Sequence, residues 1–469
     1  MTIRGVLGRG TLGLAAAASL VWVSQDGRGS LGAQPSMDRR PNLVLITVDS
    51  LRRDHLGVYG YQRPTSPVID AFAREAAVVS DAVAQAPYTK ASIATLMTGL
   101  FPSTHKTYST AAALEDLRAS GSVGTDPVHE TDVLSAEWPS LPVALKAAGY
   151  RTIGISANPY LIPDFGFANG FSSFTFVEGR NASYARADDV IDKAVQALAG
   201  TPQPFFLWVH LMDTHHPYDS PDPYRSMFPP LLPAHPIERA SIPEFLSIDG
   251  SNDLNLYQAR YDAGVRAADT AIGRLFNALR AGTQWTNTGI VLTSDHGEGF
   301  MEHGLMGHNN SLYNELLHVP LLVKLPGLRP GRVQATVQLA DLFPTLAHVA
   351  GAAIPTRLHG SDILPVLRGT RDAEPYAYSE LVGMRYALQS AKWKVIASFQ
   401  GDRELFDLTR DPAEAANLGR VDREDGDRME RLLGRALSTA INDGDAVTRR
   451  TSLVPPVVLG RLRALGYIH

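Results

Sequence analysis

The stretch Asn42-Leu-Val-Leu-Ile-Thr-Val-Asp49 decides the fold class of this 469-residue chain. It is a continuous apolar run that ends in a carboxylate, and such runs are typical of strands buried on both faces of a parallel sheet. Comparable runs recur at residues 152–156, 205–211, 289–295 and 319–324. Helical patterns separate them, at residues 66–78, 185–199 and 257–281. The alternation predicts an α/β fold with a mostly parallel central sheet flanked by helices.

The chain changes character after about residue 365. Patterns of short antiparallel strands and one charged helix follow, at residues 376–388, 392–399, 404–408 and 422–441. They predict a small antiparallel subdomain at the C-terminal end. We therefore expect a catalytic domain at residues 41–365 and a C-terminal subdomain at residues 366–469.

Residues 1–40 differ from the rest and have the layout of a signal or anchor followed by a linker. Arg4 and Arg9 precede an apolar run at residues 12–23, and Leu31-Gly-Ala33 fits a cleavage site. The run is shorter than the roughly 20 residues of a membrane span. We expect an exported protein, periplasmic or secreted, with an N-terminal anchor as the alternative and with no later integral membrane segment.

Composition bounds the function. The hydrophobic content of 44% suits a large core, and the net charge of −5 is unlike that of a basic nucleic-acid binder. Cysteine is absent, which excludes disulfides, zinc–thiolate sites and a cysteine nucleophile.

Two strand ends carry residues that bind metals. Asp49 ends the first apolar run, and Asp295 ends a later one, with His296 next to it. The carboxyl ends of parallel strands meet at one edge of a sheet, where catalytic groups gather. A lone aspartate at a strand end is more often a turn former. Two of them with an adjacent histidine favour a site for a divalent cation.

A longer motif lies between these two ends, Ala86-Pro-Tyr-Thr-Lys-Ala-Ser-Ile-Ala-Thr-Leu-Met-Thr-Gly-Leu-Phe-Pro102. It resembles the signature of the sulfatase family, part of the alkaline phosphatase superfamily. There a Cys or Ser followed by x-Pro-Ser-Arg opens a helix and leads to Thr-Gly-x-x-Pro. Thr98-Gly99-Leu-Phe-Pro102 fits the second half. Counting back places Thr89 at the nucleophile, with Ala91, Ser92 and Ile93 at the Pro, Ser and Arg positions.

Other segments resemble the same family in the same order, from residue 42 to residue 418. They lie at residues 41–57, 294–298, 311–322, 341–346 and 404–418. The resemblance implies an alkaline phosphatase-like fold. It also implies a divalent metal held by Asp49, Thr89, Asp295 and His296: calcium, magnesium or manganese for one metal, zinc for two.

Threonine at position 89 departs from the family pattern. Its β-methyl group prevents conversion to the formylglycine aldehyde that sulfatases use, and Ile93 removes the accompanying arginine. Threonine is the nucleophile in related phosphodiesterases and in phosphoethanolamine transferases, where a metal activates the hydroxyl. We therefore expect a metal-dependent hydrolase of sulfate or phosphate esters, with phosphate diesters or phosphonate-like esters favoured chemically. Ser92 is a weaker candidate, because its use would shift the spacing to Thr98.

Further polar residues are candidates through the resemblance. His215 matches a histidine that contacts the anionic group of the substrate, and His308 stands where many sulfatases have a lysine. His308 is expected to bind substrate and either to protonate the leaving group or to ligate a second metal. Asn158 ends a strand at the same edge and is a candidate for substrate binding, whereas Asp213 and His216 are candidates for a second metal. His210 lies inside a strand pattern and is assigned a structural role.

Two other functions remain open at this point. One is a transferase of the phosphoethanolamine or phosphoglycerol type, although its membrane-bound forms carry several spanning helices. The other is a catalytically inactive homologue that binds glycans. The expected partner in the leading hypothesis is a small-molecule or glycan ester, with no nucleic acid.

Overall fold

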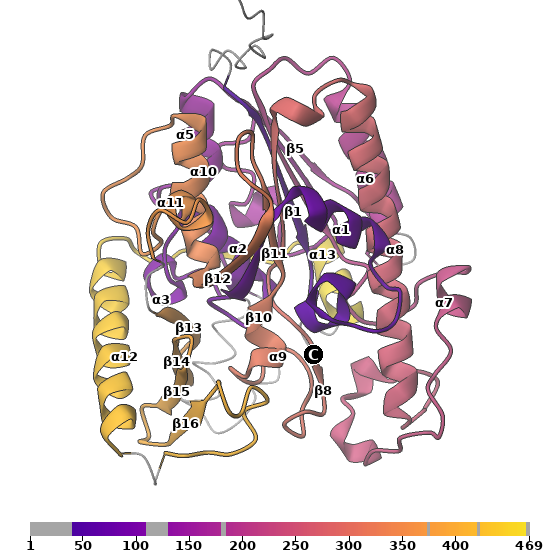
Figure 1. Ribbon diagram of the computed structural model, residues 1–469, viewed down its shortest axis with the longest axis vertical. Coiled ribbons are helices and arrows are strands. Elements are labelled where there is room, and N and C mark those ends of the chain that lie inside the picture. Colours follow the sequence, from indigo (N-terminus) through magenta and orange to yellow (C-terminus); the bar gives the residue numbers. More distant parts are fainter. Residues whose placement is uncertain (1–39, 109–129, 180–183, 373–375, 420–422, 466–469) are drawn as a thin grey trace, which may run out of the picture. The chain divides into compact units, whose positions relative to one another are not determined.

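A twisted sheet runs through the centre of the molecule (Figure 1). The computed structural model describes residues 40–108, 130–179, 184–372, 376–419 and 423–465. In those residues the central sheet has nine strands in the order β10-β2-β11-β7-β1-β6-β4-β5, with β12 beside β2. The strands are β1 (Asn42–Val48), β2 (Ala77–Val83), β4 (Arg151–Ser156), β5 (Ser173–Phe176), β6 (Phe205–Leu211), β7 (Thr288–Ser294), β10 (His318–Val319), β11 (Leu321–Lys324) and β12 (Gly331–Gln338).

The middle of this sheet is parallel, as predicted. Strand β1 pairs in parallel with β6 on one side and with β7 on the other, and β4 continues the parallel order to β5. Strand β11 is antiparallel to its neighbours β7 and β2. Thr47 of β1 lies level with His210 of β6 and Thr293 of β7. The residues just after Thr47 and Thr293 therefore emerge at one edge, beside His210.

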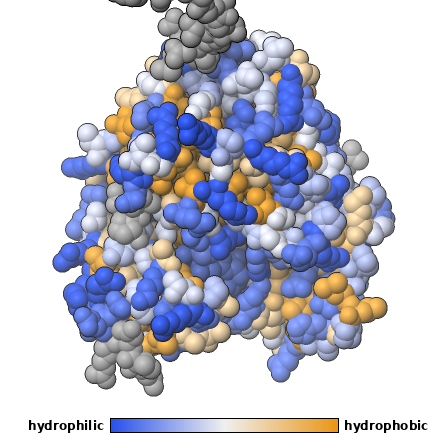
Figure 2. Space-filling view, in the orientation of Figure 1, coloured by the Kyte–Doolittle hydropathy of each residue, from blue (hydrophilic) through white to orange (hydrophobic). Residues whose placement is uncertain are grey.

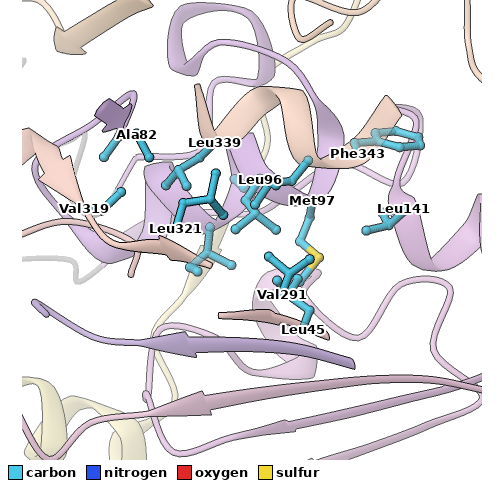
Figure 3. Close-up of a cluster of buried hydrophobic side chains, with 14 of the residues drawn as sticks. Leu45, Ala82, Leu96, Met97, Leu141, Val291, Val319, Leu321, Leu339 and Phe343 are labelled. Carbon is cyan, nitrogen blue, oxygen red and sulfur yellow. The ribbon is translucent and has the colours of Figure 1, made fainter. Parts of the chain in front are cut away.

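Alternating side chains of β1 pack into two hydrophobic clusters, one on each face of the sheet. Leu43 and Leu45 belong to the cluster built with α2 (Thr89–Thr98), α5 (Leu141–Ala147) and α10 (Leu342–Ala350). Figure 3 shows part of it, with Met97 of α2 close to Leu45 and Val291. Val44 and Ile46 face the other cluster, built with α1 (Pro67–Phe72), α6 (Ala187–Leu198) and α8 (Leu254–Ala281). This two-sided burial explains why β1 is apolar throughout.

The predicted elements differ from the observed ones in two places. The helix expected at residues 66–78 ends early, because β2 begins at Ala77 after a short turn of helix. The run at residues 319–324 is two strands, because Pro320 has no N–H for the ladder and separates β10 from β11. Strands β2 and β12 carry polar residues and were not predicted as strands.

The antiparallel part near the C-terminus is present as expected. Its sheet has the order β13 (Ala377–Leu381), β14 (Arg385–Gln389), β15 (Trp393–Ser398) and β16 (Arg403–Asp407). Helix α12 (Arg423–Gly444) packs on it through Met429 and Leu433 (Figure 1). The residues from Arg40 onward form one compact unit. The domain boundary at residue 365 therefore stays a prediction, and the expected signal at residues 1–39 lies outside the described residues.

The last described residues leave this subdomain and pack beside the main sheet without joining it. Strand β17 (Thr451–Leu453) pairs with β3 (Glu130–Asp132), and α13 (Pro456–Ala464) brings Leu465 into the cluster around α8. Short elements complete the described chain: α3 (Pro102–His105), α7 (Tyr224–Met227), β8 (Gly299–Phe300), β9 (Met306–Gly307), α9 (Asn314–Leu317) and α11 (Leu364–Leu367). Among the helices that the structure describes, none has the length and apolar character needed to cross a membrane.

Glu380 of β13 joins the C-terminal sheet to α3 and makes their contact sensitive to pH. Its side chain is fully buried, and it accepts hydrogen bonds from the Ser103 backbone N–H, at 2.6 Å, and from the Ser103 hydroxyl. Burial raises the pKa of Glu380 to about 7, against the lowering effect of the bonds from Ser103. The folded protein thus keeps a proton that the unfolded chain loses near its ordinary pKa of 4.5. We therefore expect the contribution of Glu380 to stability to fall as pH rises from 4.5 towards 7.

We expect Glu380→Gln to remove this pH dependence, which amounts to at most about 3 kcal/mol. The measurement is the free energy of unfolding in urea at pH 5 and pH 7.5. Glu424→Gln, at an exposed position in α12, is the matched control and should leave the difference between the two pH values unchanged. An equal pH dependence in Glu380→Gln and wild type would show that Glu380 does not carry it.

Candidate active site

The carboxyl edge of the parallel strands brings four buried polar side chains together. Asp49 follows β1, Asp295 follows β7, His210 is the penultimate residue of β6, and Asn158 comes two residues after β4. Asn158 Nδ2 donates to Asp49 Oδ2 at 2.8 Å, and His210 Nε2 lies 3.2 Å from the same oxygen. Asp49, His210 and Asp295 each place one ligand atom within 4.8 Å of the others.

The two carboxylates have different surroundings. Asp295 Oδ1 accepts the backbone N–H groups of Ser50, at 3.1 Å, and His296, at 2.9 Å. Asp295 Oδ2 is buried and accepts no hydrogen bond from any described residue. Burial and the negative charge of Asp49 raise the pKa of Asp295. Burial alone would raise the pKa of Asp49 too, but His215, His210 and His296 together hold it well below its usual value.

Thr89 is the first residue of α2, and its hydroxyl faces this pair. Thr89 Oγ1 lies 3.3 Å from Asp49 Oδ2 and 3.3 Å from His296 Nε2. Tyr88 before it is extended and makes no side-chain cap, and the first backbone N–H groups of a helix have no acceptor within the helix. A helix N-terminus favours an anion there. The structure therefore brings together the residues that the sequence assigned to the nucleophile and the metal: Asp49, Thr89, Asp295 and His296.

His296 is oriented by its own backbone. Its Nδ1 lies 2.8 Å from the carbonyl oxygen of Gly297 and donates to it, which leaves the lone pair of Nε2 facing Thr89. The same Nε2 lies 3.5 Å from Asp295 Oδ2. Two buried carboxylates, one oxygen without a hydrogen bond and one imidazole lone pair fit a divalent cation.

His210 belongs to this site, although sequence reasoning gave it a structural role. Its Nδ1 lies 2.8 Å from Thr47 Oγ1, and its Nε2 faces Asp49. The missed signal is the single polar residue in the otherwise apolar run Phe205–Leu211. The register beside β1 makes it a neighbour of Asp49.

Asn158 is held between two partners. Besides donating to Asp49, it accepts the backbone N–H of Tyr160 through Oδ1 at 2.8 Å. The side chain thus orients the Asp49 carboxylate at the edge of the sheet. Its expected contact with substrate stays a prediction.

His308 is paired with a buried carboxylate. Its Nδ1 lies 3.0 Å from Glu298 Oε1, and Tyr218 donates its hydroxyl to Glu298 Oε2 at 2.8 Å. Burial opposes a charge on His308, but the Glu298 carboxylate outweighs it and raises the pKa of His308. The ring centre lies 4.5 Å from that of His296 and 5.1 Å from that of His215. Glu298 belongs to the motif at residues 294–298 but was not predicted as a site residue. Its partner Tyr218 lies 80 positions away in the sequence, so no local pattern links the two.

His215 lies beside His308 and is uncharged at neutral pH. Burial lowers its pKa to about 4, despite the attraction of Asp49. Its Nδ1 lies 2.8 Å from the backbone carbonyl of His216 and donates to it. In this form Nε2 is an acceptor or a metal ligand.

The residues proposed for a second metal face different neighbours. Asp213 Oδ2 accepts the backbone N–H of Ala187 at 2.6 Å, in the first turn of α6. Burial raises the pKa of Asp213 to about 7. The ring of His216 instead packs 4.1 Å from that of His215 and 5.2 Å from that of Phe245.

The remaining positions of the signature are structural in this fold. Ser92, the weaker nucleophile candidate, donates its hydroxyl to the backbone carbonyl of Asp295 at 2.6 Å. Ile93, at the family arginine position, is fully buried in the core. Lys90 donates to Thr131 at 2.5 Å and lies 4.5 Å from the ring centre of Phe165.

The fold and the site define an α/β enzyme of the alkaline phosphatase type. Within this class the chain belongs to the sulfatase family, whose profile matches residues 41–352. A second profile, described as N-sulphoglucosamine sulphohydrolase, C-terminal, matches residues 301–441. Family members are sulfuric ester hydrolases that generally depend on a metal, and this chain is an ester hydrolase of that family.

Two relatives and one solved structure illustrate the match. Arylsulfatase K of Canis lupus familiaris is 26% identical over 456 residues, which span 83% of this chain and 81% of the relative. Delta 4,5-hexuronate-2-O-sulfatase of Bacteroides thetaiotaomicron is 24% identical over 438 residues, which span 83% and 86%. The crystal structure of the phosphonate monoester hydrolase of Agrobacterium radiobacter has the same fold, with a TM-score of 0.69. Its identity is 21% over 86% of this chain and 96% of that one.

Proposed function

We propose that this protein is a metal-dependent hydrolase of sulfate or phosphate esters in which Thr89 is the nucleophile. One observation carries the proposal: the Thr89 hydroxyl stands at the N-terminus of α2, 3.3 Å from both Asp49 Oδ2 and His296 Nε2. A nucleophile, a ligand set and a helix terminus that favours an anion thus share one place.

The residues present fit one divalent cation. Asp49, Asp295 and His296 would hold it, with Thr89 Oγ1 as a further ligand and His210 next to Asp49. When bound, the cation lowers the pKa of the Thr89 hydroxyl and offsets the charge of the ester oxygens. The mainly oxygen ligand set favours calcium, magnesium or manganese. Zinc at two sites would need a second ligand set, for which Asp213 and His216 remain candidates.

Side chains of this chain supply the remaining chemistry. Thr89 reacts as the alkoxide, after its proton has left for solvent, and forms a bond to phosphorus or sulfur. The bond to the leaving oxygen breaks, and that oxygen takes the Nε2 proton of His308. The now neutral His308 accepts a proton from water, and the water oxygen displaces Thr89. Thr89 regains a proton from solvent, which completes the hydrolysis.

Threonine bears on the choice between sulfate and phosphate. The formylglycine route of sulfatases is closed at position 89, and a threonine alkoxide suits phosphate diesters and phosphonate esters. The curated relatives are named for sulfate esters, whereas the Agrobacterium structure is named for phosphonate monoesters. Phosphate diesters and phosphonate monoesters are therefore the preferred substrates within the proposal, and sulfate esters, including sulfated glycans, are second.

A substrate panel tests the proposal. The full chain is assayed with aryl esters of sulfate, phosphate (monoester and diester) and phosphonate, first with EDTA and then with calcium, magnesium, manganese or zinc restored. We expect turnover of at least one ester, a loss of at least about a hundredfold with EDTA, and recovery with the metal. Full activity in EDTA would contradict the metal requirement.

The same assay separates the alternatives. A transferase would pass the phosphoryl-linked group to an added alcohol acceptor and release little free acid. An inactive glycan-binding homologue would turn over no ester with any metal.

We retain export as part of the proposal, on the basis of the apolar run at residues 12–23.

A further inference from the structure

The segment between β6 and α8 holds an excursion beside the catalytic edge, at residues 219–253. It contains α7 and two short 3-10 helices, Arg239–Ser241 and Glu244–Leu246. The excursion is fastened to the start of α8, where Asn255 Nδ2 donates at 2.9 Å to two of its backbone carbonyls, those of Leu231 and Pro233. Figure 1 shows α7 and this excursion beside the lower half of α8.

The turn Glu244–Leu246 is seated directly against the active site. Leu246 is buried in the cluster that contains Phe300 and Met306 of the hairpin β8–β9. A Cβ atom added to Gly307 would lie only 3.1 Å from Leu246 Cδ1. Gly307 directly precedes His308, so the turn lies against the loop that carries His308.

The neighbour of Leu246 on this turn points the other way. Phe245 is 36% exposed, and its ring centre lies 5.2 Å from that of buried His216. His216 in turn packs 4.1 Å from His215, which lies 5.1 Å from His308. The rings of Phe245, His216, His215 and His308 thus contact one another in that order, from the solvent to the side chains around Thr89.

Phe245, which is 36% exposed, is the member of this row of rings that reaches solvent and offers it an apolar ring. Binding sites combine a few polar groups that fix the reacting end with apolar or aromatic surface for the remainder. Ring faces pack well on other flat apolar faces. The histidines and Thr89 account for the charged end of an ester, and the leaving alcohol is the part that extends toward solvent.

We propose that Phe245 is a specificity-determining residue that packs against a ring of the leaving alcohol, so that esters of cyclic alcohols are preferred over acyclic ones. The shared chemistry of the ligand is a flat face of C–H or aromatic carbon, as in an aryl group or a pyranose. This inference rests on the proposed function, because it places the ester at Thr89. The contact acts on binding, since Phe245 is remote from the atoms whose bonds change.

The experiment measures binding as well as turnover, with the full chain and added manganese. Calorimetric titration with phenylphosphonate, methylphosphonate and inorganic phosphate gives three dissociation constants for wild type, Phe245→Leu and Phe245→Trp. We expect wild type to bind phenylphosphonate about tenfold tighter than methylphosphonate. Phe245→Leu should remove this preference, Phe245→Trp should keep it, and the affinity for inorganic phosphate should stay within about twofold in all three.

Leu232→Ala is the matched control, since Leu232 is a large apolar residue in the same excursion and is 89% exposed. It should change none of the three constants. Figure 2 shows apolar side chains on the lower right of this face, the region where Figure 1 draws the excursion. Thermal unfolding of each variant checks that the turn remains folded.

A second measurement distinguishes an aryl ring from a pyranose ring. It compares the KM values for three esters of the same acid, formed with phenol, with a pyranose hydroxyl and with methanol. A rise in KM with Phe245→Leu for either ring, and not for methanol, supports the inference. The inference would be overturned if the ratio of the dissociation constants for phenylphosphonate and methylphosphonate were the same in Phe245→Leu as in wild type. This holds even if wild type hydrolyses esters. Phenyl preference that depends on Phe245 without any turnover would leave the inference standing and the proposed function refuted.

Discussion

Replacing Thr89 by alanine is expected to lower turnover by at least about a thousandfold, because the variant has no oxygen to form the covalent intermediate. Alanine suits the first turn of a helix, so the fold should persist. The measurement is kcat/KM on the best ester of the substrate panel, with circular dichroism and thermal unfolding beside it.

Two variants at the same position make this result specific. Thr89→Val keeps the shape of the side chain and lacks the hydroxyl, so it should match the alanine variant. Thr89→Ser keeps the hydroxyl and should retain turnover within about a hundredfold of wild type. Activity in Thr89→Val comparable to that in Thr89→Ser would refute the nucleophile assignment.

The second large effect, a loss of stability, is expected at Gly297. Here the chain after β7 lies in direct backbone contact with residues 315–316. A Cβ atom at this position would lie 1.9 Å from the backbone oxygen of Glu315 and 3.2 Å from Cα of Leu316. Gly297 N–H donates to the Leu316 carbonyl at 2.8 Å, and Glu298 N–H donates to that of Glu315 at 3.1 Å. Any side chain must push these segments apart, and Asp295 and His296 would move with them.

We expect Gly297→Ala to lower the free energy of unfolding by at least about 3 kcal/mol, or to yield insoluble protein. Chemical denaturation of the purified variant measures this free energy of unfolding. Gly434→Ala is the matched control, because Gly434 lies in α12 and a Cβ there would have no neighbour within 4 Å. It should be neutral or stabilising by up to about 1 kcal/mol. Denaturation of Gly297→Ala at the wild-type midpoint would contradict the close approach.

The sequence predicts the centre of this fold because the decisive signals there are local. Strands β1, β6 and β7 are apolar on both faces, so each is a visible run, and Asp49 and Asp295 mark where two of them end. Strands β2 and β12 lie toward one side of the sheet and mix polar with apolar residues, so no such run marks them.

The site was predictable where a motif carries several ligands and less so where the contact is long-range. His210 gains its place from the register of β6 beside β1, and Glu298 gains its role from Tyr218 and His308. Asp213 and His216 are close in sequence, yet the chain turns after β6 and sends Asp213 to the start of α6. The nucleophilic role of Thr89 and the identity of the metal stay predictions.

The order of the strands also bears on how the chain is made. Strand β1 is synthesised before any of its partners, yet it pairs with β6 and with β7, which begins about 240 residues after β1 ends. At roughly 5–20 residues per second, that interval lasts on the order of 10 to 50 seconds. Strand β1 has both edges free until β6 is made, and the edge that pairs with β7 stays free for the whole interval. We therefore expect the unpaired edges of residues 42–48 to favour aggregation of the nascent chain until its second half arrives.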